Sequence, residues 1–277
     1  MRIDDIALES GDGHRWQLIG HAPASPRATL LWLPAMGVAA RHYLPFAEAL
    51  ADQGIATFIH EWRGHGSSNL RASRMQDWGY RELLLDDIPR SEAVVAATAT
   101  EVPLLIGGHS LGGQLAACRL AMAPHDARRL WLVACSAPFP EAFPGLFRAG
   151  VWVALAIGPG LAHAFGYWPG RRLGFGGREA RSVLTDWAGT GRARGYRIGS
   201  LGRDLDPLLA GVRVPVDAIA LADDDFAPAT AVRALLDKLG GDADLQQVDG
   251  AALGAPADHF AWLRHPTAIA RHLASRL

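Results

Sequence analysis

The pentapeptide Gly-His-Ser-Leu-Gly at residues 108–112 contains a serine that could act as a nucleophile in hydrolysis. It follows a short apolar run and precedes Ala- and Leu-rich sequence, a pattern that predicts a strand, a sharp turn and a helix. Gly108 and Gly112 would remove Cβ atoms that collide on such a turn. Ser110 would then stand at a helix N-terminus, where free N–H groups favour developing negative charge. This context favours a serine nucleophile over an ordinary Gly-rich turn.

A serine hydroxyl needs a base that removes its proton, and the base needs a carboxylate that fixes its tautomer. In hydrolases with this strand-turn-helix unit, the order along the chain is Ser, acid, His. His265 and His272 fall at the start of the expected last helix and within it. His259 lies in a loop that can reach over the sheet edge. We therefore expect His259 to be the base, with an exposed loop histidine as the alternative.

The acid is expected at the end of the strand predicted for residues 214–222, where three aspartates follow one another at 223–225. Three adjacent carboxylates repel one another, so a surface turn with a helix N-cap accounts for some of them. At least one is expected to serve His259. Asp224 and Asp225 are the candidates, and Glu141, after the preceding strand, is a weaker substitute.

An oxyanion hole needs two backbone N–H groups, one from the residue after the nucleophile and one from a loop after an earlier strand. Leu111 supplies the first. Met36, in the turn at residues 34–37, supplies the second, although its side chain alone would fit an ordinary core methionine.

The elements that must position these groups alternate along the chain. Apolar runs at 28–34, 55–61, 104–107 and 129–135 are separated by helical sequence, including residues 41–52 and a stretch at 78–97 that Pro89 should kink or break. This alternation predicts an α/β fold with a mostly parallel sheet flanked by helices, and ligands bind at the carboxyl ends of such strands. A hairpin with an Asp-Gly turn at 12–13 would add antiparallel edge strands.

The alternation stops after residue 137. Residues 138–211 contain Pro and Gly clusters, many aromatics and several arginines, and we expect them to form a helical cap that covers the site. The pattern resumes with a strand at 214–222, helix at 228–239, strand at 245–249 and helix at 266–276. The predicted organisation is a core in two parts, 1–137 and 212–277, with the insertion between them.

The composition limits the class of protein and its partners. A chain of 277 residues with 49% apolar residues can bury a full core, and a net charge of −1 gives no reason to expect a nucleic-acid partner. The two cysteines, Cys118 and Cys135, lie in apolar stretches and are expected to be buried reduced thiols. The first residues lack a signal-peptide pattern, which favours a cytoplasmic enzyme. We expect no cofactor and no metal; the oligomeric state is left open.

The apolar stretch 149–157 is interrupted by Gly158-Pro159-Gly160 and is too short to predict an integral membrane span. It could line an acyl pocket, although cap core is the commoner use of such a stretch. A cluster of arginines at 171, 172, 178 and 181 could meet an acidic substrate, but a solvated basic face is the more common interpretation.

Together these motifs resemble the α/β-hydrolase fold family. Glu-Trp-Arg-Gly-His-Gly-Ser-Ser at 61–68 is similar to the family's Asp-x-Arg-Gly-x-Gly-x-Ser loop, and Gly-His-Ser-Leu-Gly-Gly resembles the branch of monoacylglycerol lipases and serine-aminopeptidase-type hydrolases. The resemblance implies a cap at 138 and favours Asp224 as the acid, because Asp224 and Pro228 match the family's Asp-x-x-x-Pro motif. Pro34-Ala35 replaces the usual His-Gly, and Asp258 replaces a common Gly. Neither departure removes a catalytic group.

The predicted function is a serine hydrolase that cleaves a carboxylic ester with a small or medium apolar acyl group, a small-molecule substrate, through an acyl-enzyme. Ser110 attacks, His259 moves the proton, Asp224 orients His259, and the N–H groups of Met36 and Leu111 hold the oxyanion. The same triad could instead cleave an amide or peptide, split a carbon–carbon bond or form a peracid. A non-catalytic binding protein of the same fold is the alternative from another class.

Overall fold

The computed structural model describes residues 2–98, 101–123 and 127–277. An eight-stranded sheet runs through it in the order β1-β2-β4-β3-β5-β6-β11-β12. β1 is antiparallel to β2, and β2 is antiparallel to β4. The other neighbouring pairs in this order, from β4 to β12, are parallel. The strands are β1 (Arg2–Glu9), β2 (Arg15–His21), β3 (Ala28–Leu33), β4 (Ile55–Ile59), β5 (Leu104–His109), β6 (Ala127–Val133), β11 (Val216–Leu221) and β12 (Ala243–Val248).

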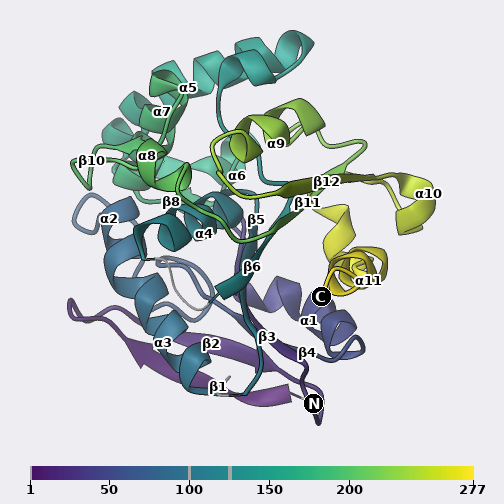
Figure 1. Ribbon diagram of the computed structural model, residues 1–277. Helices are drawn as coiled ribbons and strands as arrows, with labels where there is room; N and C mark the ends of the chain where they lie inside the picture. Colours follow the sequence, from purple (N-terminus) through teal and green to yellow (C-terminus); the bar gives the residue numbers. More distant parts are fainter. Residues whose placement is uncertain (1, 99–100, 124–126) are drawn as a thin grey trace.

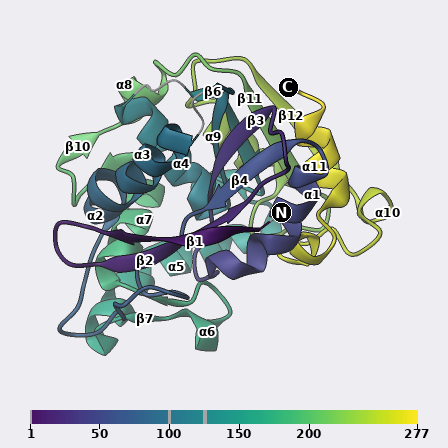
Figure 2. The same ribbon diagram turned by 90° about the horizontal axis from the view of Figure 1, so that it is seen from below.

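Helices cover both faces of the sheet, as the parallel topology requires. In Figures 1 and 2, α3 (Ile88–Thr98) and α4 (Leu111–Met122) lie on one face, and α1 (Leu44–Ala51) and α11 (Thr267–Ala274) pack together on the other. The remaining core elements are η1 (Ala40–Tyr43), α9 (Ala229–Leu236), α10 (Gly250–Leu253) and η4 (Ala261–Arg264). Every residue of β3, β4 and β11 is buried, which explains why their sequences are largely apolar. The predicted α/β class is confirmed.

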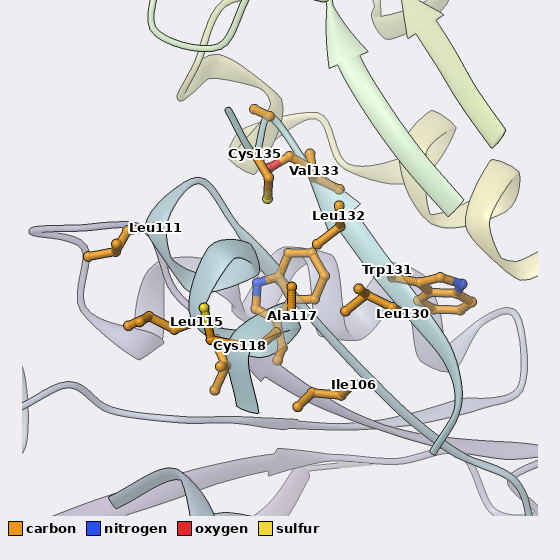
Figure 3. Close-up of a cluster of buried hydrophobic side chains, with 14 of the residues drawn as sticks. Ile106, Leu111, Leu115, Ala117, Cys118, Leu130, Trp131, Leu132, Val133 and Cys135 are labelled. Carbon is orange, nitrogen blue, oxygen red and sulfur yellow. The ribbon is translucent and has the colours of Figure 1, made fainter. Parts of the chain in front are cut away.

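The strand and helix that flank Ser110 pack tightly against the next strand. Figure 3 shows Leu115, Ala117 and Cys118 of α4 gathered with the side chains of β6. Cys118 and Cys135 are free and buried, as expected, and burial raises the pKa of both thiols. The Cys135 thiol donates to the carbonyl of Gly108 at 3.2 Å, so β6 is tied to the end of β5.

The helical stretch predicted to kink or break at Pro89 is continuous but changes its winding. It comprises α2 (Tyr80–Glu82), a π-helical turn η2 (Leu83–Asp87) and α3. Proline has no N–H to donate to the carbonyl four residues before it, and a wider turn accommodates that missing bond. The wide turn ends at Asp87, whose buried carboxylate joins the polar network described below.

Between β6 and β11 the chain forms η3 (Pro140–Ala142), α5 (Gly145–Phe165), β7 (Trp168–Pro169), α6 (Gly170–Leu173), β8 (Arg178–Glu179), α7 (Arg181–Ala193), β9 (Arg197–Ile198), β10 (Arg203–Asp204) and α8 (Asp206–Leu209). Figure 1 shows α5 and α7 packed together at one end of the sheet. This segment falls within the residues expected to form the cap.

The expected break at Gly158-Pro159-Gly160 is wrong, because α5 runs through it without interruption. Pro159 leaves the carbonyl of Leu155 without its helical partner. Arg192 of α7 donates to that carbonyl at 2.6 Å and replaces the missing bond. Gly191 permits the approach: a Cβ there would lie 2.6 Å from a methyl carbon of Leu155. The helix therefore depends on a partner 37 residues away in sequence.

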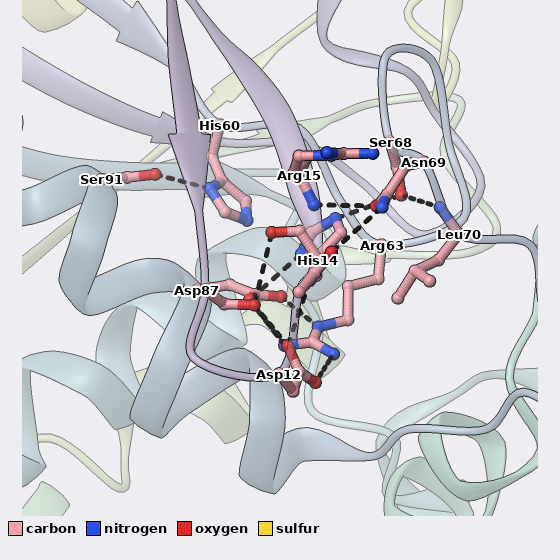
Figure 4. A network of polar contacts seen from close by, with 12 residues as sticks. Asp12, His14, Arg15, His60, Arg63, Ser68, Asn69, Leu70, Asp87 and Ser91 are labelled. Carbon is pink, nitrogen blue, oxygen red and sulfur yellow. Dashed lines mark hydrogen bonds and ion pairs between the residues drawn. The ribbon is translucent and has the colours of Figure 1, made fainter.

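A buried polar network ties the first hairpin to the loop after β4 and to η2 (Figure 4). Arg63 donates to Asp87 at 2.6 and 2.9 Å and forms an ion pair with Asp12. His14 lies 3.2 Å from Asp87 and 3.1 Å from the hydroxyl of Ser68. Burial alone would raise the pKa of Asp87, but the hydrogen bonds from His14 and Arg63 outweigh it and hold that pKa below its usual range.

This network predicts a loss of stability in acid. A carboxyl whose pKa is lowered by folding stabilises the native state above its unfolded pKa, about 3.9, and loses that contribution as the pH falls towards the folded pKa. Asp87→Asn should lower the free energy of unfolding at pH 7 by about 3–5 kcal/mol, since it leaves Arg63 and His14 incompletely paired. Urea denaturation at a series of pH values should show the difference from wild type shrinking below about pH 4.

The matched control is Asp237→Asn, which removes an exposed carboxylate with no ion pair among the described residues. Its stability should follow that of the wild type at every pH. If Asp87→Asn fails to fold, the milder Asp12→Asn variant tests the same network, because half of the Asp12 side chain is exposed. A stability difference that does not change between pH 7 and pH 3 would contradict the prediction.

Candidate active site

Ser110 stands on a strained turn between β5 and α4, with φ of 54° and ψ of −122°. A non-glycine residue persists in this region only where its surroundings require it. The surroundings are backbone in close contact: a Cβ at Gly112 would lie 2.1 Å from the carbonyl oxygen of Leu33, and one at Gly108 would lie 2.4 Å from the carbonyl carbon of Gly112. The structure thus places Ser110 on the sharp turn that the sequence predicts.

Asp224 and His259 form a buried pair. The Nδ1 of His259 lies 2.7 Å from Oδ2 of Asp224, and the two residues are 5% and 4% exposed. The other oxygen of Asp224 accepts from the N–H groups of Phe226 and Ala227 at 2.8 and 2.9 Å. The carboxylate is therefore held in one orientation, with the oxygen that faces His259 left free for the imidazole.

The neighbouring carboxylates have other partners, or none among the residues that the structure describes. Asp223 accepts from Ala257 N–H at 3.1 Å, which fastens the loop before His259 to the end of β11. Asp225 is exposed at the edge of the cavity described below. Asp258, which departs from the family pattern, accepts from the N–H groups of residues 260 and 261 where the chain enters η4. Glu141 pairs with Arg194 at the surface.

The loop after β3 is anchored by Tyr43. The Tyr43 hydroxyl accepts from Ala35 N–H at 2.8 Å and lies 2.8 Å from Nδ1 of His109. Burial and the nearby His259 lower the pKa of His109, which keeps its ring neutral. Tyr43 and His109 therefore share a hydrogen bond between neutral groups, and the tautomer of His109 sets which of them donates. Neither residue was singled out from the sequence, because their contact joins positions 66 residues apart.

Within the described chain, the backbone N–H groups of Met36 and Leu111 have no hydrogen-bond acceptor. Both residues line one cavity with Ser110. The structure therefore brings together the two donors that the sequence predicts.

Tyr43→Phe is expected to lower kcat for ester hydrolysis by about tenfold or more. The change leaves Ala35 N–H and His109 Nδ1 buried without this partner, at a cost of about 1–3 kcal/mol each, and frees the turn that carries Met36. KM should change little, because Tyr43 lies outside the cavity. Steady-state kinetics measure both constants, and Tyr167→Phe, on a residue outside this contact, is the control. A rise in KM at unchanged kcat would contradict this positioning role.

The cavity above Ser110 has a volume of about 520 Å³ and is mostly apolar. Its floor contains Ser110 and His259, and α5 supplies much of one wall. Other apolar side chains come from the segment between α5 and α7, from α4 and α7, and from the loops after β3, β6 and β11 and before η4. The apolar lining includes Phe147, Val151, Ala154, Ile157, Leu161, Trp168, Phe175, Trp187, Phe226 and Phe260.

Ser110 and His259 face this same cavity, but no hydrogen bond links their side chains among the residues described. A nucleophile and its base often lie further apart in the unliganded enzyme and approach in the reactive complex. Of the three late histidines, only His259 lines the cavity. His265 is exposed, and His272 lies in α11.

The sequence profile of the family described as "Serine aminopeptidase, S33" matches residues 24–173, more than half of the chain. The chain belongs to the serine aminopeptidase S33 family. Its membership confirms the predicted α/β-hydrolase fold and the prediction that the protein is a hydrolase.

Other similarities agree with this S33 family assignment. Over 120 residues, the chain is 29% identical to a Schizosaccharomyces pombe protein named "Putative monoglyceride lipase". The aligned part is 43% of this chain but only 31% of the relative, so it spans about a third of that protein.

Solved structures of similar fold match nearly the whole length of this S33 family member. A hydrolase from Pseudomonas aeruginosa PA01 superposes with a TM-score of 0.60 at 20% identity, covering 98% of this chain and 97% of that one. An esterase from Exiguobacterium antarcticum gives 0.61 at 14% identity and 98% coverage of both chains. A lipase in its open form gives 0.65 at 17% identity, with 98% and 97% covered.

Proposed function

We propose that this S33 family member is a serine hydrolase that cleaves carboxylic esters with a small or medium apolar acyl group. The observation that carries the proposal is the buried Asp224–His259 pair facing the same apolar cavity as Ser110 on its strained turn. Asp224 is the acid in this proposal, because Asp225 does not contact the imidazole.

The proposed reaction begins when the Ser110 hydroxyl attacks the ester carbonyl and passes its proton to Nε2 of His259. The Nδ1 proton of His259 stays on the hydrogen bond to Asp224, whose charge stabilises the imidazolium. The N–H groups of Met36 and Leu111 hold the oxyanion of the tetrahedral intermediate. His259 then protonates the leaving alcohol, an acyl-serine remains, and water, deprotonated by His259, releases the acid.

The cavity supports an apolar acyl group. A volume of about 520 Å³ is that of a small-molecule pocket. Its few polar side chains away from the proposed triad, Gln114, Ser136 and Asp225, are spread among aromatic and aliphatic groups. Gln114 and Ser136 have protein hydrogen-bond partners, Tyr196 and the Phe226 carbonyl. This lining favours burial of a hydrocarbon chain over a polar or charged one.

We also propose that residues 138–211 are a cap that closes the cavity, with the core in two parts at 1–137 and 212–277. In the described residues, α5 is the one helix whose length and composition could cross a membrane. Its inner residues Val151, Ala154 and Leu161 line the cavity. This use of α5 as a wall supports its assignment to the cap.

Labelling with a fluorophosphonate probe tests the proposed chemistry. The intact protein should lose esterase activity as one phosphonate adds per chain, and peptide mass spectrometry should place it on Ser110. A series of nitrophenyl esters from acetate to palmitate then tests the acyl assignment. We expect kcat/KM to peak at a short or medium chain, while equal activity along the series would contradict an acyl-selective cavity. Absence of labelling would favour a binding protein, and hydrolysis of anilides but not esters an amidase.

A further inference from the structure

A second cavity lies beside the first, on the other side of the segment 167–178. Its volume is about 310 Å³, and among the described residues it shares no lining residue with the active-site cavity. Four arginines and a histidine line it, with no carboxylate in its described lining. These charged residues are Arg71, Arg171, Arg172, Arg178 and His65.

Two of the arginines are held in place by neutral groups. Arg71 donates to the backbone carbonyls of residues 66, 68 and 70. Arg178 donates to the carbonyl of Ala72 at 2.8 Å, and its guanidinium lies 3.9 Å from the ring centre of Tyr167. Their positive charges are thus positioned by contacts that do not neutralise them.

The other two arginines have no ion pair or hydrogen bond in the part of the chain that the structure describes. Arg171 and Arg172 are exposed at the rim of the cavity. Arg181, the fourth arginine of the cluster noted in the sequence, differs because it pairs with Asp77 at 3.1 Å. The interpretation of a solvated basic face therefore does not describe this cluster as a whole, because part of it converges on a cavity.

The buried carboxylate of Glu179 has its own partners beside the cavity. Glu179 pairs with His65 at 3.2 Å and accepts from Gly177 N–H at 2.8 Å. Burial alone would lower the pKa of His65, but the charge of Glu179 outweighs it and raises that pKa. Glu179 does not line the cavity, and its charge acts on His65 more strongly than on Arg171.

We propose that this second cavity binds a phosphate-bearing ligand, either a phosphate monoester in solution or the phosphate of an anionic lipid. Guanidinium groups match phosphate oxygens in pairs, and a doubly charged anion relieves the repulsion among four arginines better than a monocarboxylate does. The cavity exceeds the size of a phosphate alone and leaves space for an organic part of the ligand. This site is independent of the proposed ester hydrolysis.

Calorimetric titration of the full chain with glycerol 3-phosphate tests the soluble source. Wild type should bind one equivalent saturably, and the Arg171→Gln, Arg172→Gln double variant should bind at least tenfold more weakly, since the charged hydrogen bonds of both guanidinium groups to the phosphate are lost. The matched control is Arg233→Gln, Arg271→Gln, which removes the same net charge from two exposed arginines away from the cavity. It should bind like wild type. Thermal unfolding verifies that both variants are folded.

Co-sedimentation with phosphatidylcholine vesicles, with and without one fifth phosphatidic acid, tests the lipid source. Binding only to the vesicles with phosphatidic acid, reduced in the first double variant and not in the control, would assign the phosphate to a lipid. The proposal is overturned if neither probe binds saturably, if both double variants lose the same affinity, or if succinate binds more tightly than glycerol 3-phosphate.

Discussion

Ser110→Ala is expected to lower kcat for a nitrophenyl ester by about 10⁴-fold or more, while the protein stays folded. The variant removes the hydroxyl that forms the acyl-enzyme, and the remaining groups can at most assist attack by water. The volume change is small, and the turn is held by the close backbone contacts of Gly108 and Gly112. Steady-state and single-turnover kinetics measure the loss.

Ser136→Ala is the matched control, because Ser136 lies in the same cavity and its hydroxyl donates to the carbonyl of Phe226 at 3.0 Å. It should lose less than tenfold of the activity and retain labelling by a fluorophosphonate, whereas Ser110→Ala should not be labelled. Normal ester turnover by Ser110→Ala would exclude the serine mechanism altogether.

Asp224→Asn should lower kcat by about 10⁴-fold with little change in stability. The asparagine oxygen can still accept from the N–H groups of Phe226 and Ala227, which places its NH₂ group towards His259. The imidazole must then accept at Nδ1 and carry its proton on Nε2. In that tautomer it cannot receive the proton of Ser110, so catalysis fails although the geometry is preserved.

Asp225→Asn is the comparison that separates the two candidate acids. It removes a neighbouring charge of the same sign at the cavity edge, but it leaves the imidazole contact intact. Activity within a few-fold of wild type is expected. A large loss in Asp225→Asn together with a small one in Asp224→Asn would reverse the assignment of the acid.

The core fold was predictable because its signals are local and repeated. Each buried parallel strand is a short apolar run, and helical sequence separates one such run from the next. The serine turn was predictable from its own pentapeptide, since a glycine stands two residues before and two residues after Ser110, although the contact that requires Gly112 is with the distant backbone of Leu33. The candidate acid and base were located by their order along the chain, which the fold imposes.

What the sequence did not show depends on distant partners. The continuity of α5 through Pro159 needs Arg192, and the anchoring of the loop before Met36 needs Tyr43 and His109. Pro159 alone predicted a break, because the sequence around it does not show that Arg192 replaces the missing hydrogen bond. The second cavity likewise requires Arg71 to meet arginines about a hundred residues later.

The contact between Gly37 and Gly177 limits how substrate can reach Ser110. A Cβ on Gly37 would lie 2.3 Å from the backbone nitrogen of Gly177. The turn after β3 and the segment before β8 therefore contact each other through backbone atoms at this point. If that segment swung outward, the turn with Met36 would lose its support on one side. The start of α5 is less covered, since Leu146 is 90% exposed and Phe147, which lines the cavity, is 40% exposed. We therefore expect acyl chains to enter the cavity beneath the start of α5. Entry by this route would leave the geometry around the reacting carbonyl unchanged.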